Sequence, residues 1–354
     1  MQRTVVTALK FAVSLCVVGW LIWLARDDVP ELLRQKKHWH LLATAMSVIL
    51  AMVVATFVRW WLLVRALGMD FRLRDALRLG FVGFLFNFVS LGSVGGDLFK
   101  AVFIAREQPG RRAEAVASVV IDRVIGLYGL FVVATAAVLW ESSYASDHHG
   151  VRVLSQLVLL GTGIGGVGIL LILIPGFTHG RMSRALSRLP HVGALIGQLL
   201  RAIRQFRARM GTVALALAIS IFVHCGTTCG FFWIAGGLSL PSPSLPQHFL
   251  VVPLTLLANA VPLPMGGLGA GEFALDALYQ QTAQISEGSG LIVVLGYRVI
   301  TIFVAITGVA YYLANRTFMN RVLEDESEIE SLEHSLDEDR SRNEFVGNEV
   351  SGAS

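Results

Sequence analysis

Long apolar runs separated by short polar loops dominate this chain. Runs of near-spanning length occur at 5–25, 41–58, 113–140, 153–175, 212–236 and 288–314. A helix needs about 20 apolar residues to cross the hydrocarbon core of a bilayer, so we predict about six full transmembrane helices. The first run has no cleavage site of small residues, and we expect it to be retained rather than removed as a signal peptide.

Two further apolar segments, 79–105 and 248–285, are interrupted by Gly and Pro. The first contains LFNFVSLGSVGGDLFK at 85–100, and the second contains LANAVPLPMGGLGAGEFA at 257–274. Each has an Asn, a short break, a Gly-Gly pair and then a carboxylate. Backbone groups freed by such a break are tolerated at membrane depth only inside protein or beside water. We therefore predict two broken helical hairpins rather than two more spans.

The similarity between these segments extends to an arginine downstream. Asp97 is followed 26 residues later by Arg123, and Glu272 is followed 26 residues later by Arg298. Each arginine opens an Arg-Val-Ile triplet within an apolar stretch. Corresponding interrupted hydrophobic segments in two halves of a chain are typical of transporters built from repeats. The pattern therefore favours transport.

The composition indicates a membrane protein with a polar tail. Hydrophobic residues make up 54% and charged residues 15% of the chain, whereas soluble proteins carry about 25% charged residues. Residues 321–354 hold 11 acidic and 3 basic side chains, so this tail has a net charge of −8 in a chain of net charge +4. We expect residues 1–320 to form the transmembrane domain and 321–354 to be a solvated, disordered cytoplasmic tail.

The distribution of arginine gives an orientation. The loops at 59–78 and 176–211 are rich in arginine, whereas 141–152 has one and 237–247 has no charge. The positive-inside rule places the first two loops in the cytoplasm and the last two outside. We therefore expect a multi-pass protein of the cell (inner, cytoplasmic) membrane with both termini in the cytoplasm. The loop at 26–40 disagrees, since it holds four basic residues but would lie outside.

In this orientation the two broken segments enter the membrane from opposite faces. Segment 79–105 follows a cytoplasmic loop, and segment 248–285 follows an outer loop. Similar motifs that enter from opposite faces are what an inverted-topology repeat requires. The predicted fold is therefore an all-α polytopic membrane protein with about six full spans and two re-entrant broken helical hairpins in an inverted-repeat arrangement.

The broken segments supply the candidate substrate site. A helix that begins inside the membrane presents unpaired N–H groups and a partial positive charge, which together attract anions. Glycine lets a head group approach the backbone closely, and a lysine one turn into the helix could contact a phosphate. The predicted substrate-binding residues are Asn87, Gly95, Gly96, Asp97, Lys100, Arg123, Asn259, Gly266, Gly267, Glu272 and Arg298.

The two carboxylates have two interpretations at this stage. Asp97 and Glu272 could stabilise the first turn of a helix, or each could pair with the arginine 26 residues downstream. Charges within a membrane are costly and usually face a partner or a wet cavity, although Arg123 could also snorkel towards a helix end. Asp122 points to a different helix face from Arg123, so we expect it to pair elsewhere.

These motifs resemble the transmembrane region of the lysylphosphatidylglycerol synthase family, a flippase-like group of integral membrane proteins. The resemblance lies in Asn87 with Gly95-Gly96-Asp97, in SVVIDRVIGLYG at 118–129 and in PLPMGGLGAGE at 262–272, and it extends over about 5–315. It implies re-entrant helices and a role in moving lipids or lipid-linked molecules between leaflets. Because no segment after residue 320 has the size of the synthases' soluble aminoacyl-transferase domain, we do not expect this chain to make lysyl-lipid.

The leading hypothesis is a lipid flippase that acts on membrane lipids with anionic head groups, since a basic protein body beside a bilayer favours such lipids. One alternative is a membrane-embedded transferase with Asp97 or Glu272 as general base on a lipid-linked donor. Another is a non-catalytic membrane partner of other proteins. We expect no nucleic acid, cofactor or metal, and we leave a homo-oligomer open. Cys225 and Cys229 are expected to be small packing residues.

Overall fold

The structure is a computed structural model, and it describes residues 36–89, 95–107, 111–141, 149–173, 206–207, 209–260, 270–285 and 287–314. Regular structure within these ranges is entirely helical. The described helices are α3 (Trp39–Ala66), α4 (Leu73–Val89), α5 (Gly95–Glu107), α6 (Arg112–Trp140), α8 (His149–Leu173), α12 (Met210–Gly237), α13 (Leu245–Ala260), α14 (Ala270–Ala283) and α15 (Ser289–Ala314). The chain divides into two compact units, Met1–Gly308 and Val309–Ser354.

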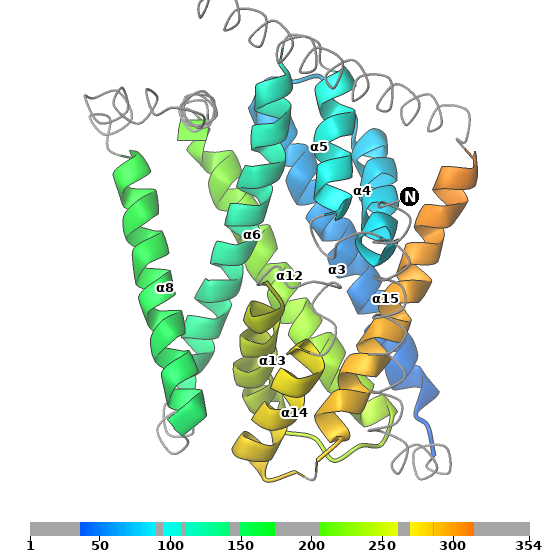
Figure 1. Ribbon diagram of the computed structural model, residues 1–354, viewed down its shortest axis with the longest axis vertical. Helices are drawn as coiled ribbons and strands as arrows, with labels where there is room; N and C mark the ends of the chain where they lie inside the picture. Colours follow the sequence, from blue (N-terminus) through cyan, green and yellow to red (C-terminus); the bar gives the residue numbers. More distant parts are fainter. Residues whose placement is uncertain are drawn as a thin grey trace, which may run out of the picture. The chain divides into compact units, whose positions relative to one another are not determined.

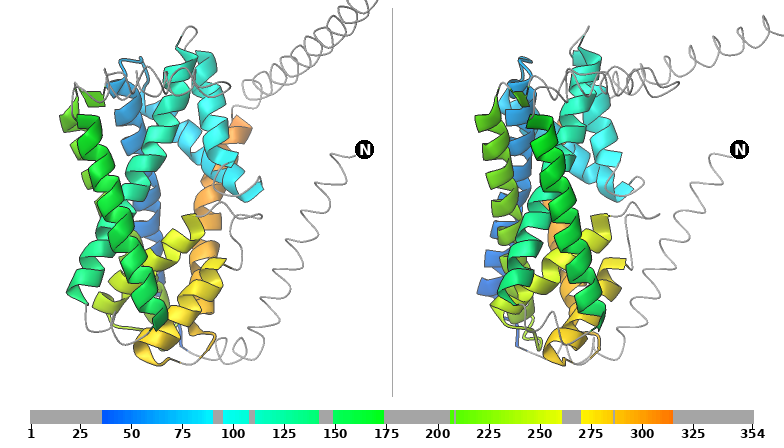
Figure 2. Two further views of the ribbon diagram at one scale, coloured as in Figure 1. Left: turned by 60° about the vertical axis from the view of Figure 1, so that its left-hand side comes forward. Right: turned by 90° about the vertical axis from the view of Figure 1, so that its left-hand side faces the viewer.

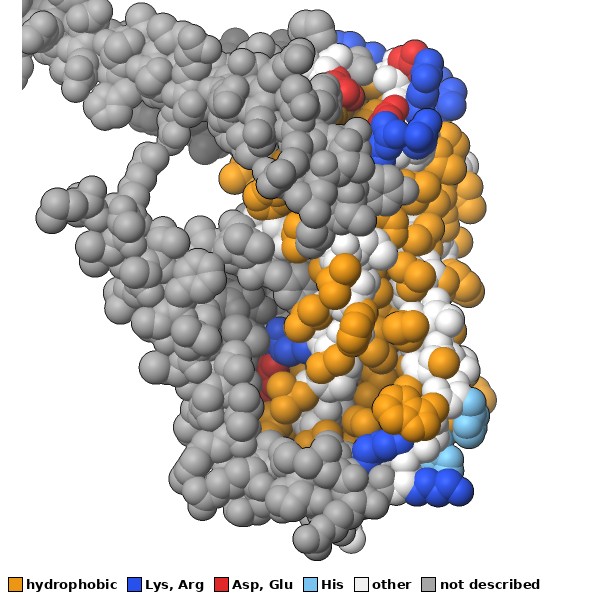
Figure 3. Space-filling model, turned by 90° about the vertical axis from the view of Figure 1, so that its right-hand side faces the viewer, with side chains coloured by type: hydrophobic (Ala, Val, Ile, Leu, Met, Phe, Trp, Pro, Cys, Tyr) orange, Lys and Arg blue, Asp and Glu red, His pale blue; other side chains and the backbone are white. Residues whose placement is uncertain are grey.

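Five of the described helices, α3, α6, α8, α12 and α15, are long and apolar enough to cross a membrane. They correspond to five of the six predicted spans. The predicted span at 5–25 and the acidic tail at 321–354 lie outside the described residues. Figure 2 shows α3, α6, α8 and α12 running side by side over much of their lengths. In Figure 3 the described part of one face is mostly hydrophobic between charged groups near its two ends.

Two pairs of shorter helices complete the described bundle. Helix α5 has 13 residues and α14 has 14, so each is about 20 Å long at 1.5 Å per residue and shorter than a membrane span. Helices α4 and α5 pack against each other, as do α13 and α14. Figure 1 shows the α4/α5 pair in the upper half of the view and the α13/α14 pair in the lower half. The residues that join each pair, 90–94 and 261–269, lie outside the described residues.

The first described helix corrects one predicted boundary. The apolar run at 41–58 predicted a loop from residue 59, but α3 continues to Ala66 and α4 already begins at Leu73. Arg59 is therefore a buried helical residue, 6% exposed, rather than a loop residue. A charge inside an apolar helix is tolerated when it has a partner, and Arg59 pairs with Asp122. Arg65 also lies on α3, over the ring of Trp61.

Small residues allow the long helices to approach one another closely. A Cβ atom added to Gly226 of α12 would lie 2.3 Å from the sulfur of Met52 on α3, and one on Gly230 would lie 3.0 Å from Ile49. Helices α6 and α8 are joined by a hydrogen bond of 2.6 Å between the hydroxyls of Thr135 on α6 and Thr162 on α8. Close packing at small residues and hydroxyl contacts are what hold helices together in a bilayer.

An apolar core joins the α13/α14 pair to the long helices α3, α6, α8, α12 and α15. Its fully buried members include Leu250 and Val251 on α13, Leu275 and Tyr279 on α14, and Val293 on α15. The α13/α14 pair is thus fixed against a long helix by side chains that exclude solvent completely. This packing holds the first turn of α14, which carries Glu272, in one place.

Candidate functional site

The start of α5 is held against α4 by one asparagine and one glycine. The side-chain Oδ1 of Asn87 accepts a hydrogen bond of 2.9 Å from the backbone N–H of Gly96. A Cβ atom on Gly96 would lie 2.0 Å from the carbonyl oxygen of Gly83 on α4, so only glycine fits here. Asn87 therefore binds one of the N–H groups that a helix start leaves unpaired. Gly95 is the first residue of α5.

Asp97 is the centre of the first charged cluster. It forms an ion pair with Arg123 on α6, and the ammonium of Lys100 lies 3.8 Å from its Oδ1 atom. The Lys100 nitrogen also lies 5.5 Å from the ring centroids of Phe57 and Trp60 on α3, a distance at which a cation is attracted to an aromatic face. Three helices, α3, α5 and α6, thus contribute to this cluster.

The start of α14 repeats the arrangement in the second half of the chain. A Cβ atom on Gly271 would lie 2.2 Å from the side-chain nitrogen of Asn259 on α13, so asparagine and glycine again meet where the second short helix begins. Glu272 forms an ion pair with Arg298 on α15, and it is fully buried. Asp97 and Glu272 are each the third residue of their helix.

The predicted pairing of each carboxylate with the arginine 26 residues downstream is confirmed by these two ion pairs. The alternative of first-turn stabilisation is compatible with them, because both carboxylates also lie where the positive end of the helix dipole acts. The side chain of Arg123 is 49% exposed and that of Arg298 is 25% exposed. From the sequence we also predict that Arg123 and Arg298 line one hydrated cavity near the membrane midplane, and this stays a prediction.

A further glycine, which the sequence did not single out, matches Gly96 in the second half. The Gly-Gly pairs made Gly266 and Gly267 the expected counterparts, but both lie outside the described residues. Gly271, directly before Glu272, makes the close contact with asparagine that Gly96, directly before Asp97, makes in the first half. In the sequence, the position directly before the carboxylate would have identified both glycines, Gly96 before Asp97 and Gly271 before Glu272.

A buried ion pair that the sequence did not identify connects three long helices. Arg59 on α3 donates to both carboxylate oxygens of Asp122 on α6, at 2.8 and 3.0 Å, and to the hydroxyl of Ser220 on α12 at 2.7 Å. Gly126 leaves room for this guanidinium, since a Cβ atom there would lie 3.0 Å from it. Asp122 thus faces away from Arg123, as its place on the helix predicted.

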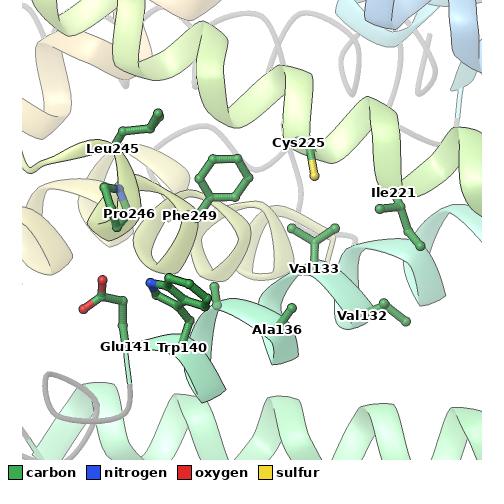
Figure 4. A pocket seen from close by; sticks show the side chains of 11 residues that line it. Val132, Val133, Ala136, Trp140, Glu141, Ile221, Cys225, Leu245, Pro246 and Phe249 are labelled. Atoms are coloured by element: carbon green, nitrogen blue, oxygen red, sulfur yellow. The ribbon is translucent and has the colours of Figure 1, made fainter.

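An apolar cavity of about 450 Å³ lies apart from both charged clusters, between α6, α12 and α13. Figure 4 shows Trp140 of α6 and Phe249 of α13 at this cavity, with Cys225 of α12 on another side. Glu141, at the end of α6, is its one charged lining residue among those described. The cavity offers hydrophobic surface but no chemistry for catalysis.

Apolar helices of spanning length, with ion pairs buried between them, define a multi-pass membrane protein. The family model for the lysylphosphatidylglycerol synthase TM region matches residues 8–308. The chain belongs to this family, which confirms the resemblance seen in the sequence. Comparison with curated proteins and with solved structures gave no match.

Proposed function

We propose that this chain is a lipid flippase that moves an anionic or lipid-linked head group between the leaflets of the cytoplasmic membrane. One observation carries the proposal: the two halves of the chain place the same carboxylate–arginine pair at the start of a short helix, Asp97 with Arg123 and Glu272 with Arg298. Matched half-helix starts in two repeats are where secondary transporters bind their substrates.

The position of the short helices supports an inverted repeat. The α4/α5 pair and the α13/α14 pair lie in opposite halves of the view in Figure 1, and each pair covers one of the two interrupted segments of the sequence. In the proposed arrangement both pairs are re-entrant hairpins, with α4/α5 entering from the cytoplasmic face and α13/α14 from the outer face. Both chain termini then lie in the cytoplasm, in accord with the positive-inside rule.

In the proposed mechanism the ion pairs are contacts that can open and close. The carboxylates hold the guanidinium groups of Arg123 and Arg298 at the helix starts, and an incoming phosphate competes with Asp97 for the guanidinium of Arg123, because guanidinium binds phosphate and carboxylate alike. Rocking of one repeat against the other exposes the head group to each leaflet in turn, while the acyl chains stay in lipid.

Transport accounts for these contacts better than the transferase alternative. That alternative needs Asp97 or Glu272 to accept a proton from a substrate, yet each carboxylate is engaged by an arginine guanidinium. Alternating access moves one repeat against the other, so it can use one carboxylate–arginine pair in each half of the chain. A transferase needs only one reacting centre.

The test is lipid translocation in vesicles reconstituted with the purified chain and labelled phosphatidylglycerol. We expect Arg123→Gln and Arg298→Gln each to reduce the rate at least tenfold. Arg65→Gln is the control, because Arg65 lies over Trp61 at the end of α3 and belongs to neither pair. Unchanged rates in both pair variants, or a wild-type rate equal to that of protein-free vesicles, would overturn the proposal.

A further inference from the structure

The two halves of the charged site differ at one matched position. Lys100 lies three residues after Asp97 on α5, whereas Leu275 lies three residues after Glu272 on α14. Since both carboxylates are the third residue of their helix, Lys100 and Leu275 occupy equivalent places in the two helix starts. One half therefore has a cation where the other has a fully buried leucine.

This difference leaves the first half with excess positive charge. The described charged side chains around the start of α5 are Arg59, Lys100 and Arg123 against Asp97 and Asp122. Arg59 and Asp122 neutralise each other in a buried bidentate pair. Asp97 alone faces two cations, so the described part of this cluster carries one net positive charge. The first turn of α5 adds its partial positive charge.

The second half has no such excess among its described side chains. Glu272 and Arg298 neutralise each other, and Leu275 is apolar. A further carboxylate on α14, Asp276, accepts hydrogen bonds from the backbone N–H groups of Gly288 and Gly290, both at 3.0 Å. Its charge is thus used to stabilise the beginning of α15. Among the described side chains, the start of α14 therefore carries no excess cation, whereas the start of α5 carries one.

The ammonium of Lys100 is also held in a defined position. Its side chain is 13% exposed, and a Cβ atom on Gly83 of α4 would lie 3.1 Å from the Lys100 Cε atom. The nitrogen is fixed between Asp97 and the rings of Phe57 and Trp60. A cation that is positioned by contacts from three helices is suited to bind an anion rather than to snorkel to the membrane surface.

We propose that the negatively charged group of the substrate binds in the α5 half alone, against Lys100 and Arg123, and that the α14 half binds no anion. The inference deepens the proposed function and rests on it. One net positive charge matches a substrate group with a single negative charge, such as the phosphodiester of a lipid head group. Lys100 then makes the protein select a negatively charged head group, while the Glu272–Arg298 pair takes part in the conformational change.

The test is equilibrium binding to the full chain in a neutral detergent. The probes are short-chain phosphatidylglycerol, short-chain phosphatidylcholine and inorganic phosphate. We expect wild type to bind phosphatidylglycerol in preference to phosphatidylcholine. We expect Lys100→Leu, which copies the second half, to weaken phosphatidylglycerol binding at least tenfold. Lys100→Arg keeps the charge and should retain more affinity for phosphatidylglycerol than Lys100→Leu does.

Arg298→Gln separates this inference from the proposed function. It should leave phosphatidylglycerol affinity within about threefold of wild type while translocation falls.

Equal losses of affinity in Arg298→Gln and Lys100→Leu would overturn the one-sided site, as would full affinity in a folded Lys100→Leu variant. Lys100-dependent binding without any translocation by wild type would keep the site and reject the flippase. Tighter binding of inorganic phosphate than of phosphatidylglycerol would keep the Lys100 site but overturn its assignment to a lipid.

Discussion

Arg59 of α3 and Asp122 of α6 form a buried bidentate ion pair, with nitrogen–oxygen distances of 2.8 and 3.0 Å. The pair lies directly beside Arg123, which faces the other way and contacts Asp97 on α5. Two successive residues of α6 thus connect two different parts of the bundle. Asp122 fixes α6 to the long helices α3 and α12, while Arg123 holds the short helix α5.

The first prediction concerns this ion pair. Arg59→Leu leaves the Asp122 carboxylate buried without its cation, which costs about 3–5 kcal/mol in comparable sites. We expect a marked fall in the thermal unfolding temperature in detergent. The double variant Arg59→Leu with Asp122→Leu is the control, because replacing a whole buried pair with apolar residues is often close to neutral. A single variant as stable as wild type would contradict a structural role for the pair.

The second prediction concerns the contact between α4 and α5. Gly96→Ala places a Cβ atom 2.0 Å from the carbonyl oxygen of Gly83 and 2.6 Å from Oδ1 of Asn87. Because backbone cannot move aside cheaply, we expect the hairpin to separate and the unfolding temperature to fall sharply. Gly163→Ala on α8 is the matched control, since no atom lies within 4 Å of its added Cβ. Equal stability of the two variants would show that the α4/α5 contact is not as close as described.

The third prediction concerns the corresponding glycine of the second half. The three atoms nearest to a Cβ atom on Gly271 all belong to the side-chain amide of Asn259, with the nitrogen at 2.2 Å. A side-chain amide can rotate, so we expect Gly271→Ala to destabilise the protein less than Gly96→Ala does. The measurement is the same thermal unfolding series. The opposite order would mean that Asn259 cannot yield, and that the second hairpin is the more rigidly packed of the two.

The fourth prediction concerns the beginning of α15. The Oδ1 atom of Asp276 accepts hydrogen bonds from the backbone of Gly288, Gly290 and Leu291, and its Oδ2 atom accepts one from Gln280. Asp276→Ala leaves several buried N–H groups unsatisfied, at about 1–3 kcal/mol for each such group. Gln280→Ala removes one side-chain donor only and should cost about 1 kcal/mol. Comparable losses in the two variants would argue against this capping role.

The fifth prediction concerns a buried polar pair between α13 and α14. The Tyr279 hydroxyl lies 2.7 Å from Nε2 of His248, and both side chains are fully buried. Tyr279→Phe keeps the ring but leaves the Nε2 atom of His248 without its partner, which costs about 1–3 kcal/mol. A double-mutant cycle with His248→Leu measures the coupling. A coupling energy near zero would show that the hydrogen bond does not hold the two helices together.

Several features could be read from the sequence because they depend on local pattern. Five of the predicted spans appear as helices of suitable length and hydropathy, since an apolar run of about 20 residues has few other stable arrangements in a bilayer. The pairing of Asp97 with Arg123 and of Glu272 with Arg298 was also predictable. Charges in an apolar stretch require partners, and the spacing of 26 residues occurs twice.

The tertiary structure decided which helices meet. The sequence placed Arg59 in a loop, because an arginine after an apolar run usually ends a span; its partner lies 63 positions away on α6. Glycine pairs drew attention to Gly266 and Gly267, which lie outside the described residues. Close packing adds Gly271, which meets Asn259 on the neighbouring helix. The sequence by itself therefore determined the class of protein, five of the spans and the pairing of Asp97 with Arg123 and of Glu272 with Arg298. Only the packed helices showed that Arg59 pairs with Asp122 and that Lys100 joins Arg123 at Asp97, because electrostatic interactions depend on distances between elements that sequence spacing does not specify.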